Sequence, residues 1–177
     1  MKALYYAVLL TAFLRLQSCT AAAFDKAHPA ESKCEEQFPK RMLGAWEATE
    51  LQEHFYVDKI AFEKSTVTYE MTAISPGNPA SLTLTRDSVE LRKLRRDYVF
   101  NVAVDSLWIC YVFHQPSRNR LEIYGFDEDA GHYVQRFETE DTRQGIEFVK
   151  YYATEEEWDV LVKSDALKRV AAYERVR

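Results

Sequence analysis

The densest apolar stretch of the chain, residues 98–114, sets the expected architecture. It is rich in β-branched and aromatic residues and contains no Gly or Pro. Asp105 and Ser106 lie near its middle, and both residue types favour turns. The stretch therefore predicts two paired central strands, beside which the remaining strands can be placed.

On either side of this pair, short apolar segments alternate with turns. The cleanest period of two lies in residues 66–74, where Tyr69 and Met71 share one face. Further short strands are predicted at residues 56–64, 81–85, 88–93, 121–126, 132–138 and 145–152. Because no helical period separates them, these segments predict an antiparallel meander of about eight strands. The expected fold class is mainly β: a single up-and-down barrel, or a strongly curved sheet, which leaves few open edges.

The end of the chain has a different period. Thr154 and Glu157 have the spacing of a capping box, and Trp158, Leu161 and Val162 follow at helical spacing. We therefore expect a carboxyl-terminal α-helix from about residue 154, with a second helical turn leading into residues 166–177.

The central strands carry large residues on both faces. Tyr111 and Phe113 alternate with Trp108, Cys110 and Val112. Such strands are covered on both sides or expose a surface for a partner, and we expect the terminal helix to pack over Tyr111 and Phe113.

The amino terminus has the pattern of a secretory signal peptide, assigned to residues 1–18. Lys2 supplies a positive charge, and residues 3–14 form an apolar run too short to span a bilayer. Leu16-Gln17-Ser18-Cys19 then resembles the bacterial lipobox, which implies acylation of Cys19 as the first residue of the mature protein. The alternative is signal-peptidase cleavage at Ala21-Ala22-Ala23, which releases a soluble protein that begins at Phe24. Both alternatives predict export, either to the cell envelope as a lipoprotein or as a secreted protein.

Residues 19–40 are predicted to be a flexible tether. They are rich in Ala and charged residues, contain Pro29 and Pro39, and keep no strand or helix period. The folded domain is then expected to span residues 41–177.

Export places the remaining cysteines in an oxidising compartment. Cys34 and Cys110 would then form a disulfide between the tether and a central strand. The alternative is that Cys110 is a small buried apolar residue and Cys34 a free surface thiol.

Composition narrows the function classes. With 177 residues, 47% of them hydrophobic and 29% charged, the chain suits one globular domain. Its net charge is −5, and loss of Lys2 and Arg15 with the leader would make it −7. Nucleic acid and anionic membrane surfaces are poor partners for so acidic a domain, so we expect membrane contact only through a lipid anchor.

Gly44-Ala45-Trp46 opens the first strand after the tether and resembles the G-x-W motif of the lipocalin superfamily. Together with the meander and terminal helix, it resembles bacterial lipocalin-like lipoproteins. In lipocalins a late Asp-Tyr motif and an Arg near the last strand support that Trp. Asp97-Tyr98 falls too early for the first, and the candidates for the second are Arg136, Arg143 and Lys150. On physical grounds, Trp46 is expected to close one end of the barrel.

The resemblance implies a binding site for a small apolar molecule inside the barrel. The candidate lining residues are Tyr69, Met71, Phe100 and Trp108. Because a barrel of about eight strands is either filled by side chains or holds one ligand, the many aromatic residues also allow a solid core. Two functions follow: a non-enzymatic binding protein for a small apolar ligand, or a protein-binding lipoprotein of inhibitor or immunity type.

Sequence motifs for enzyme chemistry are absent. The chain has no G-x-S-x-G, P-loop, H-E-x-x-H or paired C-x-x-C motif, and it points to no cofactor. His114 and His132, with Asp127 or Asp129, have the residue types of metal ligands, but carboxylates in a polar turn are usually solvated. No metal site is therefore predicted.

Overall fold

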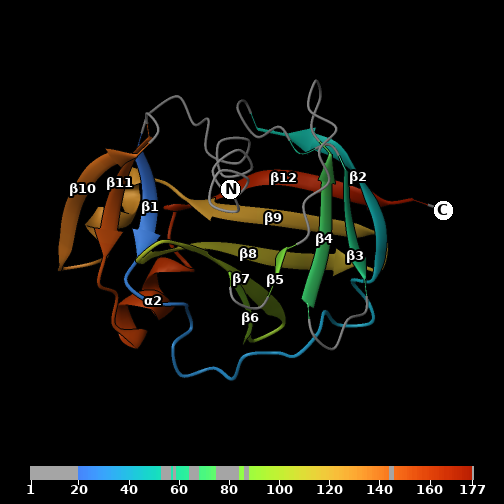
Figure 1. Ribbon diagram of the computed structural model, residues 1–177, viewed down its shortest axis with the longest axis horizontal. Helices are drawn as coiled ribbons and strands as arrows, with labels where there is room; N and C mark the ends of the chain where they lie inside the picture. Colours follow the sequence, from blue (N-terminus) through green and yellow to red (C-terminus); the bar gives the residue numbers. More distant parts are fainter. Residues whose placement is uncertain are drawn as a thin grey trace.

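Strands dominate the computed structural model, which describes residues 20–52, 57, 59–63, 68–74, 84–85, 88–143 and 146–176 (Figure 1). The strands are β1 (Thr20–Phe24), β2 (Gly44–Leu51), β3 (Lys59–Glu63), β4 (Thr68–Ile74), β5 (Leu84–Thr85), β6 (Val89–Leu94), β7 (Asp97–Val104), β8 (Leu107–Ser117), β9 (Arg120–Phe126), β10 (Phe137–Arg143), β11 (Ile146–Tyr151) and β12 (Leu167–Arg175). A 3₁₀-helix η1 (Glu128–His132) and an α-helix α2 (Glu155–Leu161) complete the described elements.

The strands form one bent sheet that does not close. Its order is β10-β11-β1-β8-β9-β12-β2-β3-β4-β5, and a β6–β7 hairpin branches from β8. In Figure 1, β8, β9 and β12 run across the molecule, while β2, β3 and β4 stand at a steep angle to them. Among the described strands, β10 and β5 are the two ends of this order, so the sheet is open and is not a closed barrel. The predicted mainly β class is confirmed.

The predicted central pair is confirmed. β7 and β8 pair without interruption from Tyr98↔Phe113 to Val104↔Leu107. Asp105, in the turn between them, has a φ of 54°, a backbone conformation that Asp tolerates better than most residues. The turn thereby fixes the register of the hairpin.

β8 has a hydrophobic core on each face. Leu107, Ile109, Tyr111 and Phe113 belong to an inner core that faces β2, β3 and β12. The alternating residues Cys110 and Val112 belong to an outer core with α2 and η1. This arrangement explains why β8 is apolar on both faces from Leu107 to Phe113.

The helix prediction was right about the start and wrong about the end. Thr154 and Glu157 form the predicted capping box, with Thr154 Oγ1 accepting from Glu157 N at 3.2 Å. Residues 167–175 are not helical but form β12, which lies between β9 and β2. Two strand partners in this position override the helix propensity of a segment that contains Leu167, Ala171, Ala172 and two Arg residues.

The helix covers the sheet on the face opposite to the predicted one. Trp158 and Leu161 pack with Cys110 and Val112 in the outer core, whereas Tyr111 and Phe113 point into the inner core. The predicted alternation of β8 is therefore confirmed, but the helix packs on the face of Cys110 and Val112 and not on the face of Tyr111 and Phe113.

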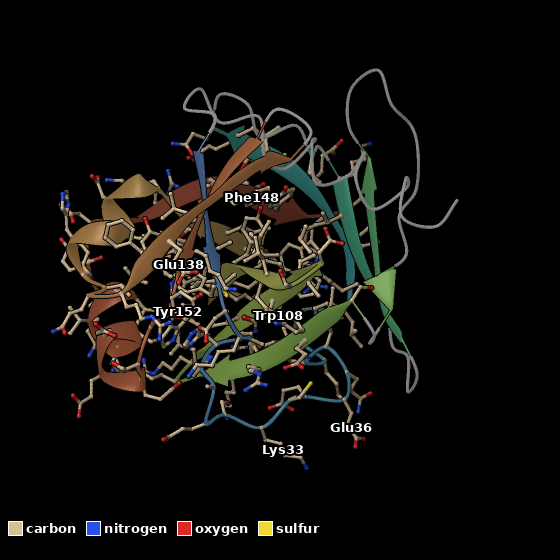
Figure 2. All side chains as sticks on the ribbon, turned by 60° about the vertical axis from the view of Figure 1, so that its left-hand side comes forward. Lys33, Glu36, Trp108, Glu138, Phe148 and Tyr152 are labelled. Carbon is tan, nitrogen blue, oxygen red and sulfur yellow. The ribbon has the colours of Figure 1, made fainter. Side chains whose placement is uncertain are left out.

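The predicted flexible tether is also wrong for residues 20–40. β1 pairs in parallel with β11 from Thr20↔Glu147 to Phe24↔Tyr151, which corrects the expectation of a wholly antiparallel sheet. Ala23 and Phe24 have no solvent exposure, and Phe38 is 2% exposed. We call residues 25–40 the strap, because they cross the sheet and connect β1 to β2. Figure 2 shows Lys33 and Glu36 of the strap pointing away from the sheet.

Candidate functional site

The predicted closing residue Trp46 is locked in place at the start of β2. Its side chain has no solvent exposure, and its indole Nε1 donates to Met42 O at 2.8 Å. The guanidinium carbon of Arg175, in the last strand, lies 4.3 Å from the centre of a Trp46 ring, a cation–π geometry.

Arg175 also ties three backbone segments together. Its guanidinium donates to the carbonyl oxygens of Leu43 at 2.5 Å, of Arg118 at 3.2 Å and of Arg41. Gly44 allows this approach: its φ is +114°, and a Cβ there would lie 3.0 Å from Arg175 Nη1. We call Trp46, Gly44 and Arg175 the Trp46 lock.

Of the basic residues named from the sequence, Arg136 and Lys150 do not take this role. The guanidinium of Arg136 lies 4.2 Å, and the ammonium of Lys150 5.3 Å, from the ring centre of Tyr152. The side chain of Arg143 lies outside the described residues. Arg175 was missed because its segment was expected to be helical.

The candidate ligand-lining residues are not brought together where they are described. Phe100 is 2% exposed in the inner core, with Phe113 and Phe38 rings centred 5.3 and 5.9 Å away. Trp108 pairs with Ala103 and is half-buried on the opposite face of the hairpin (Figure 2). β4 carries Tyr69 and Met71, whose side chains lie outside the described part of the structure.

The predicted disulfide is absent, because neither Cys34 nor Cys110 forms a disulfide in the structure. Cys34 is exposed and pairs with Arg92 of β6, whereas Cys110 is buried in β8. Because β6 and β7 both separate them, and neighbouring strands lie about 4.8 Å apart, the two sulfur atoms cannot reach bonding distance. The alternative, a buried Cys110 and a surface Cys34, is the arrangement observed.

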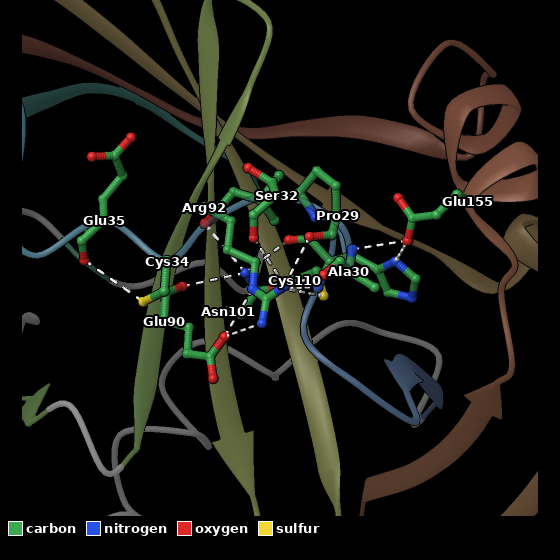
Figure 3. Close-up of polar contacts among 12 residues, drawn as sticks. Pro29, Ala30, Ser32, Cys34, Glu35, Glu90, Arg92, Asn101, Cys110 and Glu155 are labelled. Carbon is green, nitrogen blue, oxygen red and sulfur yellow. Dashed lines mark hydrogen bonds and ion pairs between the residues drawn. The ribbon is translucent and has the colours of Figure 1, made fainter.

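A network of polar groups holds the strap on the sheet instead (Figure 3). Arg92 Nη1 donates to the carbonyl oxygens of Pro29, Ala30 and Ser32 at 2.9, 2.7 and 3.2 Å. Buried Asn101 exchanges two hydrogen bonds with the backbone of His28, both of 2.9 Å. These contacts satisfy backbone groups that would otherwise be buried without partners, so we assign this network a structural role.

A pocket of about 260 Å³ opens on the outer face, where the β6–β7 hairpin meets the end of α2. Four apolar side chains contribute to its wall: Leu94, Val112, Val162 and Leu167. They come from β6, β8, the C-cap of α2 and the first position of β12. We call this cavity the outer pocket.

Four polar side chains, Arg95, Asp97, His114 and Tyr124, complete the lining of the outer pocket. His114 Nδ1 lies 2.7 Å from Asp97 Oδ1. Tyr124 donates its hydroxyl proton to Glu122 Oε2 at 2.9 Å. Burial, together with this carboxylate, raises the pKa of the Tyr124 hydroxyl above its ordinary value. Apolar walls with a few convergent polar groups are typical of a small-molecule site.

The Asp97–His114 pair could have been predicted from the positions of the two residues in the hairpin. In a hairpin with a two-residue turn, residues equally distant from the turn face each other. Asp97 precedes Asp105 by as many residues as His114 follows Ser106. His114 was instead considered with His132, which is exposed in η1 with its Nδ1 3.8 Å from Asp129.

No protein-family model matches this chain, and no curated protein or solved structure matches it. Across the described residues, no group of three or more His, Cys, Asp and Glu side chains could hold a metal ion. None of the helices in that part of the chain is long and apolar enough to cross a bilayer.

Proposed function

We propose that this chain is an exported, lipid-anchored binding protein with lipocalin-like architecture, which holds a small apolar ligand and catalyses no reaction. The Trp46 lock carries the proposal. The resemblance to lipocalins implies a Trp in a G-x-W motif supported by an Arg near the last strand, and Arg175 of β12 stacks on Trp46.

The position of β1 supports acylation of Cys19 over cleavage within Ala21-Ala22-Ala23. Cleavage before Phe24 would remove all but one residue of β1, which joins β10 and β11 to β8 in the strand order. Ala22 and Ala23 are 6% and 0% exposed, so their loss would open both cores. A mature chain that begins at Cys19 keeps the strand whole.

Labelling with a radioactive or clickable fatty acid in a bacterial host tests the anchor. The Cys19→Ala variant should lose the label and leave the membrane fraction. A Cys34→Ala variant, which changes an exposed thiol of the strap, is the matched control and should keep the label. Undiminished labelling of Cys19→Ala would contradict the lipid anchor.

Mass spectrometry of the purified mature protein tests the ligand. We expect an apolar small molecule in stoichiometric amount that is released on denaturation and absent from a mock purification. If none is found, the binding-protein proposal fails for small molecules.

A protein-binding function is the second candidate, and the packed inner core favours it. Phe38, Phe62, Phe100 and Phe113 form a continuous set of ring contacts with centres 4.6 to 5.9 Å apart. This part of the interior is therefore filled by side chains. In that case, crosslinking in intact cells should join the chain to one protein at defined stoichiometry, with no co-purifying ligand.

A further inference from the structure

The outer pocket has the features of a ligand site that is separate from the inner core of the sheet. Val112 points to this side of β8, opposite the inner-core residues Tyr111 and Phe113. A molecule in the outer pocket would therefore be separated from the inner core by the sheet itself. This site was not among the residues expected from the sequence.

Hydrogen-bond polarity decides which ligand groups the pocket can satisfy. An ionised carboxylate only accepts, so in the Asp97–His114 contact of 2.7 Å the imidazole Nδ1 is the donor. In a neutral imidazole that donates through Nδ1, Nε2 is an acceptor. The Tyr124 hydroxyl donates its hydrogen bond to Glu122, so towards a ligand its oxygen can act only as an acceptor. The polar side of the pocket thus calls for a ligand that donates.

The charges around the pocket favour a neutral ligand. Arg95 is the cation among the lining residues, and its Nη2 lies 3.4 Å from Asp159 Oδ2. Beyond the lining, Glu122 is paired with Arg120 at 2.9 Å and with Arg169 at 3.4 Å. Asp97 adds a negative charge beside His114. An anionic group would have to displace Asp159 from Arg95 while approaching Asp97.

The volume limits the size of the ligand. At about 30 Å³ for each water-sized group, a cavity of about 260 Å³ holds roughly nine non-hydrogen atoms. This volume lies just below the usual range for ligand pockets, which begins at about 300 Å³.

We infer that the outer pocket binds a small neutral molecule with an apolar body and one hydroxyl group, which donates a hydrogen bond to His114 or Tyr124. An alkylphenol or a short-chain alcohol has this chemistry. The inference deepens the proposed binding function and rests on it, because it assigns the ligand to a place and a chemical class.

Three matched probes test the ligand class on the mature protein. These are 4-methylphenol, its methyl ether 4-methylanisole, which cannot donate, and 4-methylbenzoate, which is anionic. Binding is followed by methyl NMR shifts of Val112, Val162 and Leu94. We expect the phenol to bind with saturable shifts, about tenfold more tightly than the ether, as befits one hydrogen bond in a partly buried site.

Two variants and a control test the place. Val162→Trp fills the pocket and should abolish binding of the phenol. His114→Phe removes the acceptor and should weaken phenol binding about tenfold while leaving ether binding unchanged. His132→Phe changes an exposed His of η1 that does not line the pocket, and it should have no effect. Because Val162→Trp leaves the Asp97–His114 pair intact, it keeps the test valid if His114→Phe fails to fold.

Each remaining outcome overturns the inference. Equal affinity for the phenol and the ether would show that the hydroxyl group donates no hydrogen bond that matters for binding. Tighter binding of the benzoate would show that the pocket prefers an anion to a neutral ligand. Phenol binding that survives Val162→Trp places the site elsewhere. If no probe binds but the native protein still co-purifies with a small molecule, this inference fails while the proposed binding function stands.

Discussion

His28 is the buried titratable residue of the strap, and its surroundings predict how stability depends on pH. Its side chain has no solvent exposure, and its ring stacks on Trp158 with 4.5 Å between ring centres. Burial, with smaller effects from the positive charges of Lys26 and Arg92, lowers the pKa of His28 from 6.5 to about 3. The folded protein therefore keeps this imidazole neutral under conditions in which the unfolded chain protonates it.

Stability should accordingly decrease as the pH falls from 6.5 towards 3. In this window the unfolded state binds one more proton at His28 than the folded state, which costs about 1.4 kcal/mol per pH unit. His28→Phe keeps an aromatic ring against Trp158 and cannot titrate. Urea denaturation of both proteins between pH 7 and 4 should show a shallower loss of stability in the variant. Parallel curves for the two proteins would contradict the buried, neutral His28.

The two cysteines make a second prediction about single residues. Burial raises the pKa of the Cys110 thiol far above its ordinary value, whereas Cys34 is exposed. In a Cys19→Ala background, a thiol reagent should modify one equivalent in the native protein and two after denaturation. If the denatured, unreduced protein gives no reactive thiol, a Cys34–Cys110 disulfide exists after all.

At the scale of elements, the sequence predicted those features that depend on contacts between residues close together in the chain. The capping box at Thr154 and the turn at Asp105 both act within a few residues, and both are present in the structure. β1 and β12 were missed for the opposite reason. The sequence of β1, TAAAF, has little strand propensity, and β12 contains good helix formers. Their strand conformation comes from neighbours distant in the sequence, such as β11 for β1 and β2 for β12.

The dependence of the sheet on β1 can be measured by truncation. A chain of residues 20–177 should fold cooperatively, whereas residues 24–177 should lose protection of β10 and β11 in amide hydrogen exchange. The reason is that chain 24–177 lacks four of the five β1 residues that pair with β11 and keeps only Phe24, which pairs with Tyr151 of β11 and Trp108 of β8. A single residue is a weak link between the β10–β11 pair and the rest of the sheet.

Single substitutions provide a matched test of the same element. Ala23→Glu places a charge at a fully buried position of β1 and should mimic the truncation, whereas Lys26→Ala, at an exposed position after β1, should not. Equal protection of β10 and β11 in chains 20–177 and 24–177 would show that β1 is dispensable. It would also revive signal-peptidase cleavage before Phe24.

At the scale of the whole molecule, the Trp46 lock joins parts of the chain that no local pattern connects. Gly44 and Trp46 were recognised from the sequence because they lie in one short motif. Arg175 was not, because finding it required the order of the strands, in which β12 lies beside β2. The same reasoning applies to the outer pocket, whose wall combines residues of β6, β7, β8, β9, β12 and the C-cap of α2.

Arg175 should therefore contribute to global stability through its shape as well as its charge. The flat guanidinium stacks on Trp46 and donates to the carbonyl oxygens of Arg41, Leu43 and Arg118. Arg175→Ala removes all of these contacts and should lower the free energy of unfolding by about 3 kcal/mol. Arg175→Lys keeps the charge but not the planar fork, so it should recover less than half of this loss.

Urea denaturation at neutral pH measures these differences, and Arg136→Ala is the matched control. Arg136 is also a cation over an aromatic ring, but its side chain is 71% exposed, so its loss should change stability by less than about 0.5 kcal/mol. If Arg175→Lys is as stable as the unmodified protein, the charge alone suffices and the fork is unnecessary. If Arg175→Ala is no more destabilising than Arg136→Ala, the Trp46 lock does not hold β12 against the start of β2, and the principal support for the proposed lipocalin-like architecture is lost.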